Sequence, residues 1–394
     1  MKDQPRTFQL ASTAPQLMTR AREATGIFDI VDRDISEVLE KYVHALNTEA
    51  GLNEAGATAM EWHLLQILTN RLRMLRDFRQ HPEIEEQQII RPLIISGAAR
   101  TGSTKLQKML AASGDFLFLP CWQGVSLSLL TGDRSEDAAE RIRIASEHIG
   151  WFNDHAPNAR LIHEFSTFEP EEENLILAHL LFAPYMLAFA LTPEFLQWYV
   201  ATQDFRENFR FLKRGLQYLQ WQFHDGESRP WVLKNPTYLG LEPLLAEVFP
   251  DAAFVCTHRE PVSTMSSSLS LLHNYHVGYS DIDHRLLLGQ MMVEGLAIGR
   301  EQQIAVRNAH PDLKVLDIPY SSTTANAETV LEQLYAYAGL QMSDQARQAM
   351  RSWEQENSQH KLGAHLHRLE DFGVNDDAVR TRFGVYIGRF GNSF

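Results

Sequence analysis

A short apolar run, a loop of small residues and a helix-like segment follow one another, and this order constrains the fold more than any other feature. The run Leu-Ile-Ile-Ser at 93–96 reads as a buried strand, residues 97–104 as a tight turn, and residues 105–112 as the opening of a helix. In such a unit the backbone N–H groups of the loop and the positive end of the helix converge on one point. Residues 96–106 are therefore predicted to cradle a phosphate or sulfate ester.

The loop contains Gly97 and Gly102, which permit close backbone approach, but it lacks the Gly-Lys-Ser/Thr ending of a Walker A loop. Lys105 follows Thr104 instead of preceding it, so the lysine that reaches the β- and γ-phosphates of a nucleotide is missing. The next two predicted strands end in basic residues, whereas a kinase needs a carboxylate there to hold magnesium. A P-loop kinase of a small metabolite is therefore the alternative and not the leading interpretation.

Three further strand candidates, at 230–234, 252–258 and 313–320, alternate with helical segments. This order predicts a parallel sheet with right-handed crossovers. The expected fold class is α/β: a P-loop-like parallel sheet flanked by helices, with an N-terminal helical layer and a helical cap.

Two stretches of helical periodicity define the predicted domain organisation. Residues 1–90 read as an N-terminal helical extension packed on the core, and residues 91–394 as one α/β domain with a helical cap insertion at about 136–225. The apolar residues of the N-terminal helices suit packing either on their own sheet or on a second subunit. A homodimer is therefore one of the two arrangements that the sequence allows.

The composition is typical of a globular protein, since 44% of the 394 residues are apolar and 22% are charged. A net charge of −14 disfavours broad binding to nucleic acid or to an anionic membrane, so an anionic ligand needs a local basic site. The longest apolar runs are too short to span a bilayer, and the N-terminus lacks the apolar core of a signal peptide. Cys121 and Cys256, the two cysteines, predict neither a disulfide framework nor a zinc site. A soluble protein of the reducing cytoplasm is expected.

Three sequence motifs follow one another along the predicted strand ends. The first is Ala-Arg-Thr-Gly-Ser-Thr at 99–104, and the second is Leu-Lys-Asn-Pro at 233–236, which places Lys234 at the carboxyl end of a strand. The third is Arg259 at the end of the next strand, with Ser267 eight positions later in the following helix. In open α/β sheets these carboxyl ends are where ligands bind.

In this order the motifs resemble those of sulfotransferases that use 3'-phosphoadenosine 5'-phosphosulfate (PAPS), specifically the bacterial branch similar to tyrosylprotein sulfotransferases. The ordered resemblance covers roughly residues 60–394. It implies transfer of a sulfuryl group from PAPS to a hydroxyl, or less readily an amine, of a small-molecule or lipid-like acceptor. The product would be 3'-phosphoadenosine 5'-phosphate (PAP). Such a reaction requires no metal, and no cluster of His, Asp and Glu in the sequence has metal-ligand spacing.

The resemblance also implies roles for individual residues. The loop would grip the 5'-phosphosulfate and Arg259 the 3'-phosphate, with the Ser267 hydroxyl adding to the grip of that guanidinium. Lys234 would act on the bridging oxygen of the leaving PAP and Arg100 on the sulfuryl oxygens, because positioning and electrostatics dominate such transfers. The implied cofactor-binding residues are Arg100, Thr101, Gly102, Ser103, Thr104, Arg259 and Ser267.

The catalytic base is the point at which this sequence departs from its relatives. They often carry Trp-Glu about twenty residues after the loop arginine, whereas this chain has Trp122-Gln123, and an amide cannot take a proton. Substitutes lie at the predicted head of the cap helix: His163, Glu164, Glu169, Glu171 and Glu172. Of these, Glu172 and His163 are the catalytic candidates on general acid–base grounds, although acidic residues in a first helical turn commonly serve only the helix dipole. A catalytically degenerate protein that binds PAPS or PAP is therefore a further alternative.

Aromatic residues of the cap are candidates for lining an apolar acceptor pocket, although such stripes more often belong to the core. They are Trp151, Phe152, Phe182, Tyr185, Trp198 and Tyr199. Neither the acceptor nor the oligomeric state follows from the sequence.

Overall fold

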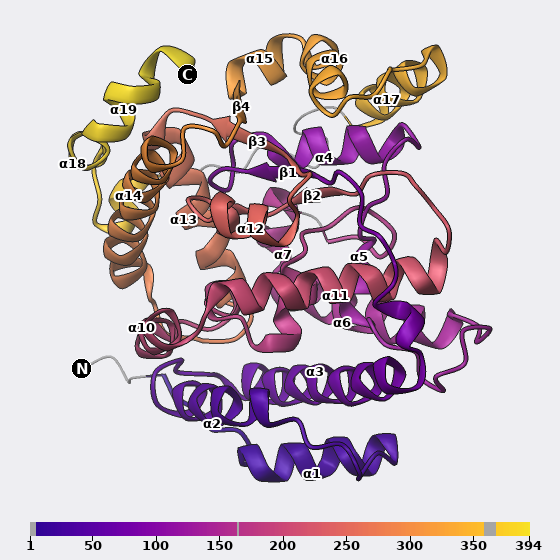
Figure 1. Ribbon diagram of the computed structural model, residues 1–394. Coiled ribbons are helices and arrows are strands. Elements are labelled where there is room, and N and C mark those ends of the chain that lie inside the picture. Colours follow the sequence, from indigo (N-terminus) through magenta and orange to yellow (C-terminus); the bar gives the residue numbers. More distant parts are fainter. Residues whose placement is uncertain (1–4, 164, 358–367) are drawn as a thin grey trace.

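A four-stranded parallel sheet lies at the centre of the molecule (Figure 1). The computed structural model describes residues 5–163, 165–357 and 368–394. The strands are β1 (Leu93–Ser96), β2 (Val232–Lys234), β3 (Ala253–His258) and β4 (Val315–Pro319), in the spatial order β2-β1-β3-β4. All pairings are parallel, so the predicted fold class is confirmed.

The register of the sheet brings the three sequence motifs to one edge. Ile95 of β1 pairs with Lys234 of β2 on one side and with Val255 of β3 on the other. The loop that follows Ser96 therefore leaves the sheet between the end of β2 and the end of β3. Because β1 is a central strand, the basic residues at both neighbouring strand ends flank this loop.

Both faces of the sheet are covered, so β1 and β2 are buried along their whole length. Successive side chains of a strand point to opposite faces. Leu93 and Ile95 pack with residues of the helices α4 (Ser103–Ala112) and α16 (Ala327–Tyr337) on one face. Ile94 packs with the larger core formed by the cap and the N-terminal helices on the other face.

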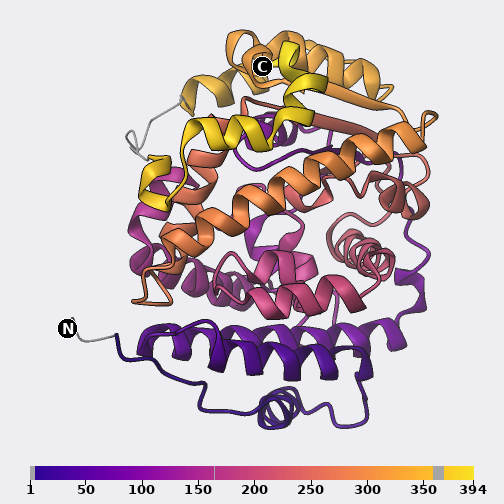
Figure 2. The ribbon, with the colours of Figure 1, turned by 90° about the vertical axis from the view of Figure 1, so that its left-hand side faces the viewer.

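The N-terminal helices form the layer farthest from the sheet in both views (Figures 1 and 2). They are α1 (Ala14–Thr25), α2 (Arg33–Thr48) and α3 (Glu54–Gln80), followed by the 3-10 helix η1 (Pro82–Ile84). The buried guanidinium of Arg71 on α3 donates to both carboxylate oxygens of Asp32, at 2.6 and 2.8 Å, and to the backbone oxygen of His179 at 3.0 Å. This contact attaches the layer to the cap, so the N-terminal helices cover the cap and not the sheet itself.

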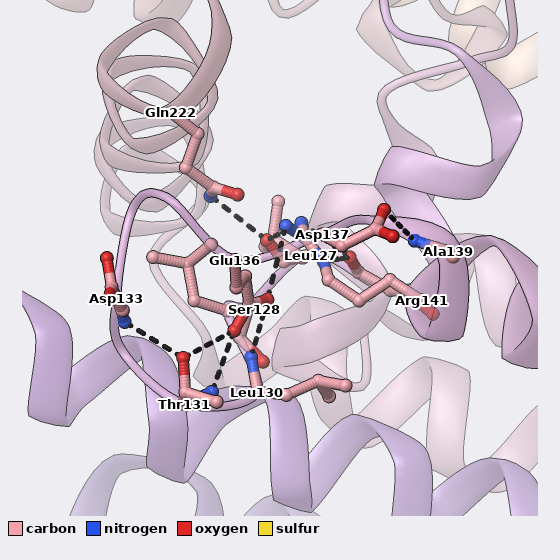
Figure 3. Close-up of polar contacts among 12 residues, drawn as sticks. Leu127, Ser128, Leu130, Thr131, Asp133, Glu136, Asp137, Ala139, Arg141 and Gln222 are labelled. Carbon is pink, nitrogen blue, oxygen red and sulfur yellow. Dashed lines mark hydrogen bonds and ion pairs between the residues drawn. The ribbon is translucent and has the colours of Figure 1, made fainter.

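The cap lies between that layer and the sheet. It contains α6 (Ala139–His155), α7 (Pro157–Ile162), α8 (Asn174–Leu177), η2 (Ala178–Leu180), α9 (Ala183–Met186), α10 (Pro193–Thr202) and α11 (Phe205–Phe223), and the short helix α5 (Cys121–Val125) precedes it. The connection from α5 into the cap is fixed from two sides (Figure 3). Arg141 on α6 donates to the backbone oxygens of Ser126 and Leu127 at 3.0 and 3.1 Å, and Gln222 on α11 donates to that of Leu127 at 3.2 Å. The buried Arg141 thereby fixes where α5 ends.

The remaining helices lie around the sheet (Figure 1). They are η3 (Pro236–Tyr238), α12 (Glu242–Val248), α13 (Pro261–His276), α14 (Arg285–Ala309), α15 (Tyr320–Ala325), α17 (Asp344–Glu356), η4 (Leu369–Phe372), α18 (Asp376–Arg382), α19 (Gly384–Phe390) and η5 (Gly391–Ser393). Helix α13 begins directly after β3, because Pro261 suits a first helical position and the Glu260 carboxylate accepts a hydrogen bond from Ser263 N at 2.8 Å. Among the described residues, no helix is long and apolar enough to cross a membrane.

Candidate active site

The loop after β1 is held in a backbone shape that few residues tolerate. Gly97 and Gly102 have φ values of 123° and 88°, and Arg100, which is not a glycine, has 67°. A Cβ atom on Gly97 would lie 2.5 Å from Thr257 Oγ1 and 2.8 Å from Thr257 O, so the loop is pressed against β3. The Thr101 hydroxyl lies 2.6 Å from Ala98 O and 2.6 Å from Thr257 Oγ1, which fixes the loop from within. A residue held at positive φ is typical of a site that is built in advance of its ligand.

The loop delivers the chain to the N-terminus of α4 without a side-chain cap. The capping position is Gly102, and no side chain accepts a hydrogen bond from the first turn there. The first N–H groups of α4, beginning with Ser103 and Thr104, are therefore donors for an anion. Lys105 does not enter this loop, because its ammonium lies 2.5 Å from Glu354 Oε1 on α17 and 3.4 Å from Thr323 O.

Two arginines meet beside the loop. Arg259 donates to the backbone oxygen of Arg100 at 2.7 Å, and its guanidinium carbon lies 4.2 Å from the ring centre of Tyr320. Arg100 donates through Nε to Ser267 Oγ at 3.0 Å, so the serine that we expected to assist Arg259 contacts Arg100 instead. Burial lowers the pKa of Arg100, and the positive charge of Arg259 acts in the same direction.

In the part of the chain that the structure describes, neither of these guanidiniums forms an ion pair with a carboxylate. Two neighbouring, partly buried cations without a counter-ion repel each other, and a bound anion relieves that repulsion. The loop, the α4 N-terminus and the two arginines therefore fit an anionic ligand with more than one charged group.

Lys234, at the end of β2, lies on the other side of the loop from Arg259. Its side chain is only 2% exposed, and its ammonium lies 2.5 Å from Glu172 Oε1, whose side chain is 21% exposed. Glu172 Oε2 also accepts a hydrogen bond from Asn174 Nδ2 at 3.1 Å. The pair thus connects the edge of the sheet to the segment that precedes α8.

The two glutamates beside Glu172 have different partners. Glu171 Oε2 lies 3.0 Å from His163 Nε2, and although burial opposes it, the charge of His163 lowers the pKa of Glu171. Glu173 accepts hydrogen bonds from the backbone N–H of Lys234 at 3.0 Å and from the Tyr238 hydroxyl at 3.1 Å. Burial raises the pKa of Glu173 to about 8, which the hydrogen bond from Lys234 N opposes. Three consecutive carboxyl groups therefore have three different sets of partners.

The sequence pattern predicted these glutamates in the first turn of a long helix, but they do not lie there. Helix α8 begins only at Asn174. The backbone oxygen of Glu173 accepts hydrogen bonds from residues of α8, but the Glu173 side chain does not cap the helix. The helix dipole is therefore not what places Glu171 and Glu172; their ionic partners place them. Glu169 lies 3.5 Å from Lys108 with 45% of its side chain exposed, and Glu164 lies outside the described residues.

A cavity of about 240 Å³ opens between the loop, the 163–175 segment, α13 and α14. Ala98 and Ala99 of the loop form one wall, and His163 and Glu172 contribute polar groups near it. The rest of the lining is largely apolar and includes Leu175, Leu187, Leu271, Leu272, Met292 and Leu296. Both catalytic candidates from the sequence therefore face the same cavity, next to the loop.

Two residues of α13 that sequence reasoning missed also line the cavity. The Ser268 hydroxyl is buried and finds no hydrogen-bond partner among the described residues. Burial and the charges of Glu171 and Glu172 raise the pKa of Tyr275, while Arg100 acts in the opposite direction, so its phenol lies among these groups. The signal was the helical spacing of 268, 271, 272 and 275, which places four lining residues on one face of α13.

The predicted aromatic lining is correct for one residue. Tyr185 borders the cavity, whereas the other five aromatic candidates pack in or against the hydrophobic core. Gln123, which stands where the resemblance led us to expect a glutamate, is buried on α5 and is not among the described lining residues. The glutamine at position 123 therefore does not leave the cavity without a carboxylate, because Glu171 and Glu172 line it.

The chain matches a family model, described as Sulfotransferase family, over residues 92–344. It is similar in fold to the crystal structure of sulfotransferase STF9 from Mycobacterium avium, with a TM-score of 0.82, 21% identity and coverage of 98% of each chain. It is also similar to sulfotransferase STF1 from Mycobacterium tuberculosis H37Rv, with a TM-score of 0.77, 26% identity and coverage of 96% of this chain and 100% of that one. No curated protein matches the sequence.

Proposed function

Because the chain belongs to the sulfotransferase family, we propose that it transfers a sulfuryl group from PAPS to a hydroxyl group of an apolar or lipid-like small molecule and releases PAP. An amine is the less favoured acceptor group. The observation that carries the proposal is the pair Arg100 and Arg259, which lack carboxylate partners among the described residues and lie beside an uncapped helix N-terminus. PAPS supplies the activated sulfuryl group and carries anionic groups at two positions of its ribose.

The residues that would hold PAPS fit its two anionic ends. The loop N–H groups, Ser103 and Thr104 suit the 5'-phosphosulfate, with Arg100 directed at the sulfuryl oxygens. Arg259 suits the 3'-phosphate, because it projects from the neighbouring strand end with its guanidinium fixed against Tyr320. Ser267 acts by orienting Arg100 through its hydroxyl. Thr101 keeps the loop in place through its hydroxyl, and Thr101 and Gly102 remain proposed cofactor-binding residues through their backbone N–H groups.

Lys234 and Glu172 are the groups that we assign to the chemical step. Lys234 donates to the bridging oxygen, where negative charge develops as the sulfur–oxygen bond breaks. Glu172 accepts the proton of the acceptor hydroxyl as the new sulfur–oxygen bond forms. In the structure the two groups neutralise each other, so a bridging oxygen that draws Lys234 away leaves Glu172 with an uncompensated charge. Binding of the donor thereby prepares the base.

His163 is the second candidate for the base. Its Nε2 is engaged by Glu171, in the way a carboxylate orients a catalytic imidazole. We assign the proton transfer to Glu172 because Glu172, unlike His163, pairs with the ammonium of Lys234, which lies beside the leaving group in this proposal. His163 then orients the carboxylate segment and borders the acceptor.

The cavity supports the acceptor class. Its walls of Leu and Met side chains suit an apolar body, and its polar groups, such as Glu172 and His163, suit the acceptor hydroxyl. The unpartnered hydroxyl of Ser268 suits one further polar group on the acceptor.

Two alternatives are less well supported. For a P-loop kinase, the ammonium of Lys105 would have to enter the loop, but it is engaged by Glu354. For a degenerate PAPS-binding protein, the cavity would have to lack a base, but Glu172 and His163 both line it.

We further propose that residues 91–394 form the catalytic unit with its cap and that residues 1–90 form an extension that packs on the cap. A reducing cytoplasm is the proposed compartment, since both cysteines are free and buried. A homodimer stays one of two possible assemblies.

A turnover assay tests the proposal. Labelled PAPS is incubated with the protein and a panel of hydroxylated lipids, sterols and phenols, and label on the acceptor is measured together with PAP. Label transfer that depends on an apolar acceptor is the expected result. Transfer from magnesium-ATP, with none from PAPS, contradicts the proposal and favours the kinase.

A further inference from the structure

The end of β3, which carries Arg259, is gripped by the last two α-helices of the chain. Helices α18 and α19 lie more than a hundred residues away in sequence but pack beside α13 and α14 (Figures 1 and 2). They contact His258 and Glu260, the two residues on either side of Arg259 at the strand end. The grip therefore surrounds the residue that we assign to the 3'-phosphate.

Tyr386 on α19 makes the central contact. Its hydroxyl lies 3.0 Å from His258 Nδ1, and its side chain is fully buried. Burial raises the pKa of Tyr386 to about 12, while the charge of Arg300 acts in the opposite direction. The phenolic oxygen thus contacts the side chain that directly precedes Arg259.

His258 is fixed on its other side as well. Nε2 lies 2.8 Å from Asp317 Oδ1, and Arg307 holds both oxygens of that carboxylate at 2.8 and 2.9 Å. A carboxylate can only accept, so Nε2 carries a proton and Nδ1 faces the Tyr386 hydroxyl. The ring of Phe390, also on α19, stacks on the imidazole with 4.2 Å between ring centres.

Glu260 completes the grip. One of its oxygens caps α13 through Ser263 N at 2.8 Å, and the other lies 3.5 Å from Arg380 on α18. The residues on both sides of Arg259 are therefore connected to the C-terminal helices through side-chain contacts.

This cluster is a hydrogen-bond network and not a metal site. Cys256, His258 and Asp317 have ligand atoms within 4.8 Å of one another. Gln303 donates to Cys256 Sγ at 2.9 Å, and Arg307 occupies both oxygens of Asp317. The buried Arg300, 3.9 Å from the same sulfur, adds a further positive charge that repels a cation.

We propose that Tyr386, with His258, is a positioning residue that sets the backbone at Arg259 and so determines how strongly the protein prefers nucleotides that carry a 3'-phosphate. This inference rests on the proposed function, because it assumes that Arg259 binds that phosphate. A guanidinium binds a phosphate well only in a defined orientation, and the backbone at the strand end sets where the side chain starts. Removing the phenolic oxygen leaves His258 Nδ1 without its partner, so the residue directly before Arg259 loses its contact with α19.

The test compares PAP with adenosine 5'-phosphate (AMP), which lacks the 3'-phosphate, by calorimetric titration of the full-length protein. The variant is Tyr386→Phe. The matched control is Tyr335→Phe, since Tyr335 is equally buried and its hydroxyl donates to Asp115 Oδ2 at 2.8 Å, outside the site. Tyr386→Phe should weaken PAP binding about five- to tenfold and change AMP binding by less than about twofold. Tyr335→Phe should leave the ratio of the two affinities unchanged.

An unchanged PAP-to-AMP ratio in Tyr386→Phe overturns the inference, as does an equal loss in Tyr335→Phe. If Tyr386→Phe does not unfold cooperatively, Phe390→Leu decides, because it loosens the stacking on His258 with a small change in volume. The same loss of the ratio supports the inference, and the wild-type ratio overturns it. A wild-type protein that does not prefer PAP to AMP overturns the proposed function itself, and the inference with it.

Discussion

The ammonium nitrogen of Lys234 lies 2.5 Å from a carboxylate oxygen of Glu172, and this contact joins the end of β2 to the wall of the cavity. Lys234 is almost completely buried, whereas Glu172 is partly exposed toward the cavity. A single ion pair therefore separates the position proposed for the donor from the position proposed for the acceptor. Any ligand that draws Lys234 toward the loop changes the charge that Glu172 presents to the cavity.

The first prediction concerns Glu172. Glu172→Gln keeps the shape of the side chain and a hydrogen-bond acceptor for Lys234, but it cannot take a proton. With PAPS and an accepted acceptor, kcat should fall about 10²- to 10⁴-fold, while PAP affinity stays close to that of the wild type. Glu169→Gln is the matched control, because this carboxylate lies in the same segment but is not among the described residues that line the cavity. Full activity in Glu172→Gln would assign the proton transfer to His163.

The second prediction concerns the loop backbone. Gly97→Ala places a Cβ atom 2.5 Å from Thr257 Oγ1 at a φ of 123°, so the loop and β3 must separate. The free energy of unfolding should fall by about 2 to 4 kcal/mol, measured by denaturant titration. Gly114→Ala is the control, since its φ is also positive, at 80°, but nothing lies within 4 Å of the added atom. It should cost only about 1 kcal/mol. Equal losses in both variants would mean that the loop is not pressed against β3.

Much of this arrangement could be predicted from the sequence, because the signals are local. The run at 93–96, the glycines of the loop and Pro261 each predict a strand, a turn or a helix start from nearby residues alone. The four strands and their parallel orientation were therefore predicted. Lys234 and Arg259 were placed at one edge of the sheet for the same reason.

What could not be predicted depends on contacts between distant segments. Ser267 was expected to assist Arg259, but the positive φ of Arg100 brings that guanidinium to the hydroxyl instead. Glu171 and Glu172 were expected in a helical turn, but His163 and Lys234 hold them before α8 begins. No local sequence pattern indicates that Glu172 pairs with Lys234, 62 residues away, so this pairing required the structure.

The third prediction concerns pH and Glu173. Its pKa is raised from 4.5 to about 8 in the folded protein, so between these values the folded state keeps a proton that the unfolded state has lost. Stability therefore falls as pH rises from about 5 to 8, by about 1 kcal/mol per pH unit from this group. Glu173→Gln removes the titration. Its melting temperature relative to the wild type should rise as pH increases from 5 to 8, measured by calorimetry at each pH. A difference that does not change with pH would show that Glu173 is ionised in the folded protein.

The fourth prediction concerns Ser268. Ser268→Ala removes a buried hydroxyl without a partner, so the melting temperature should stay the same or rise slightly. The KM for the acceptor should increase about three- to tenfold while the KM for PAPS does not change, because only the acceptor cavity loses a polar group. Ser126→Ala is the matched control, since its hydroxyl is equally buried and unpartnered but does not line the cavity. An acceptor KM that is unaltered in Ser268→Ala would remove this hydroxyl from acceptor binding.

The central claim is that the loop and Arg259 bind a nucleotide with a 3'-phosphate, and a thermal-shift titration with PAP, AMP and magnesium-ATP tests it most directly. Ligand that binds only the folded protein raises its melting temperature by mass action. The account predicts a larger rise with PAP than with AMP or magnesium-ATP, and loss of that preference in Arg259→Ala. Arg210→Ala, which removes an exposed arginine of α11 far from the loop, should behave like the wild type. Stabilisation by magnesium-ATP without stabilisation by PAP would contradict the account.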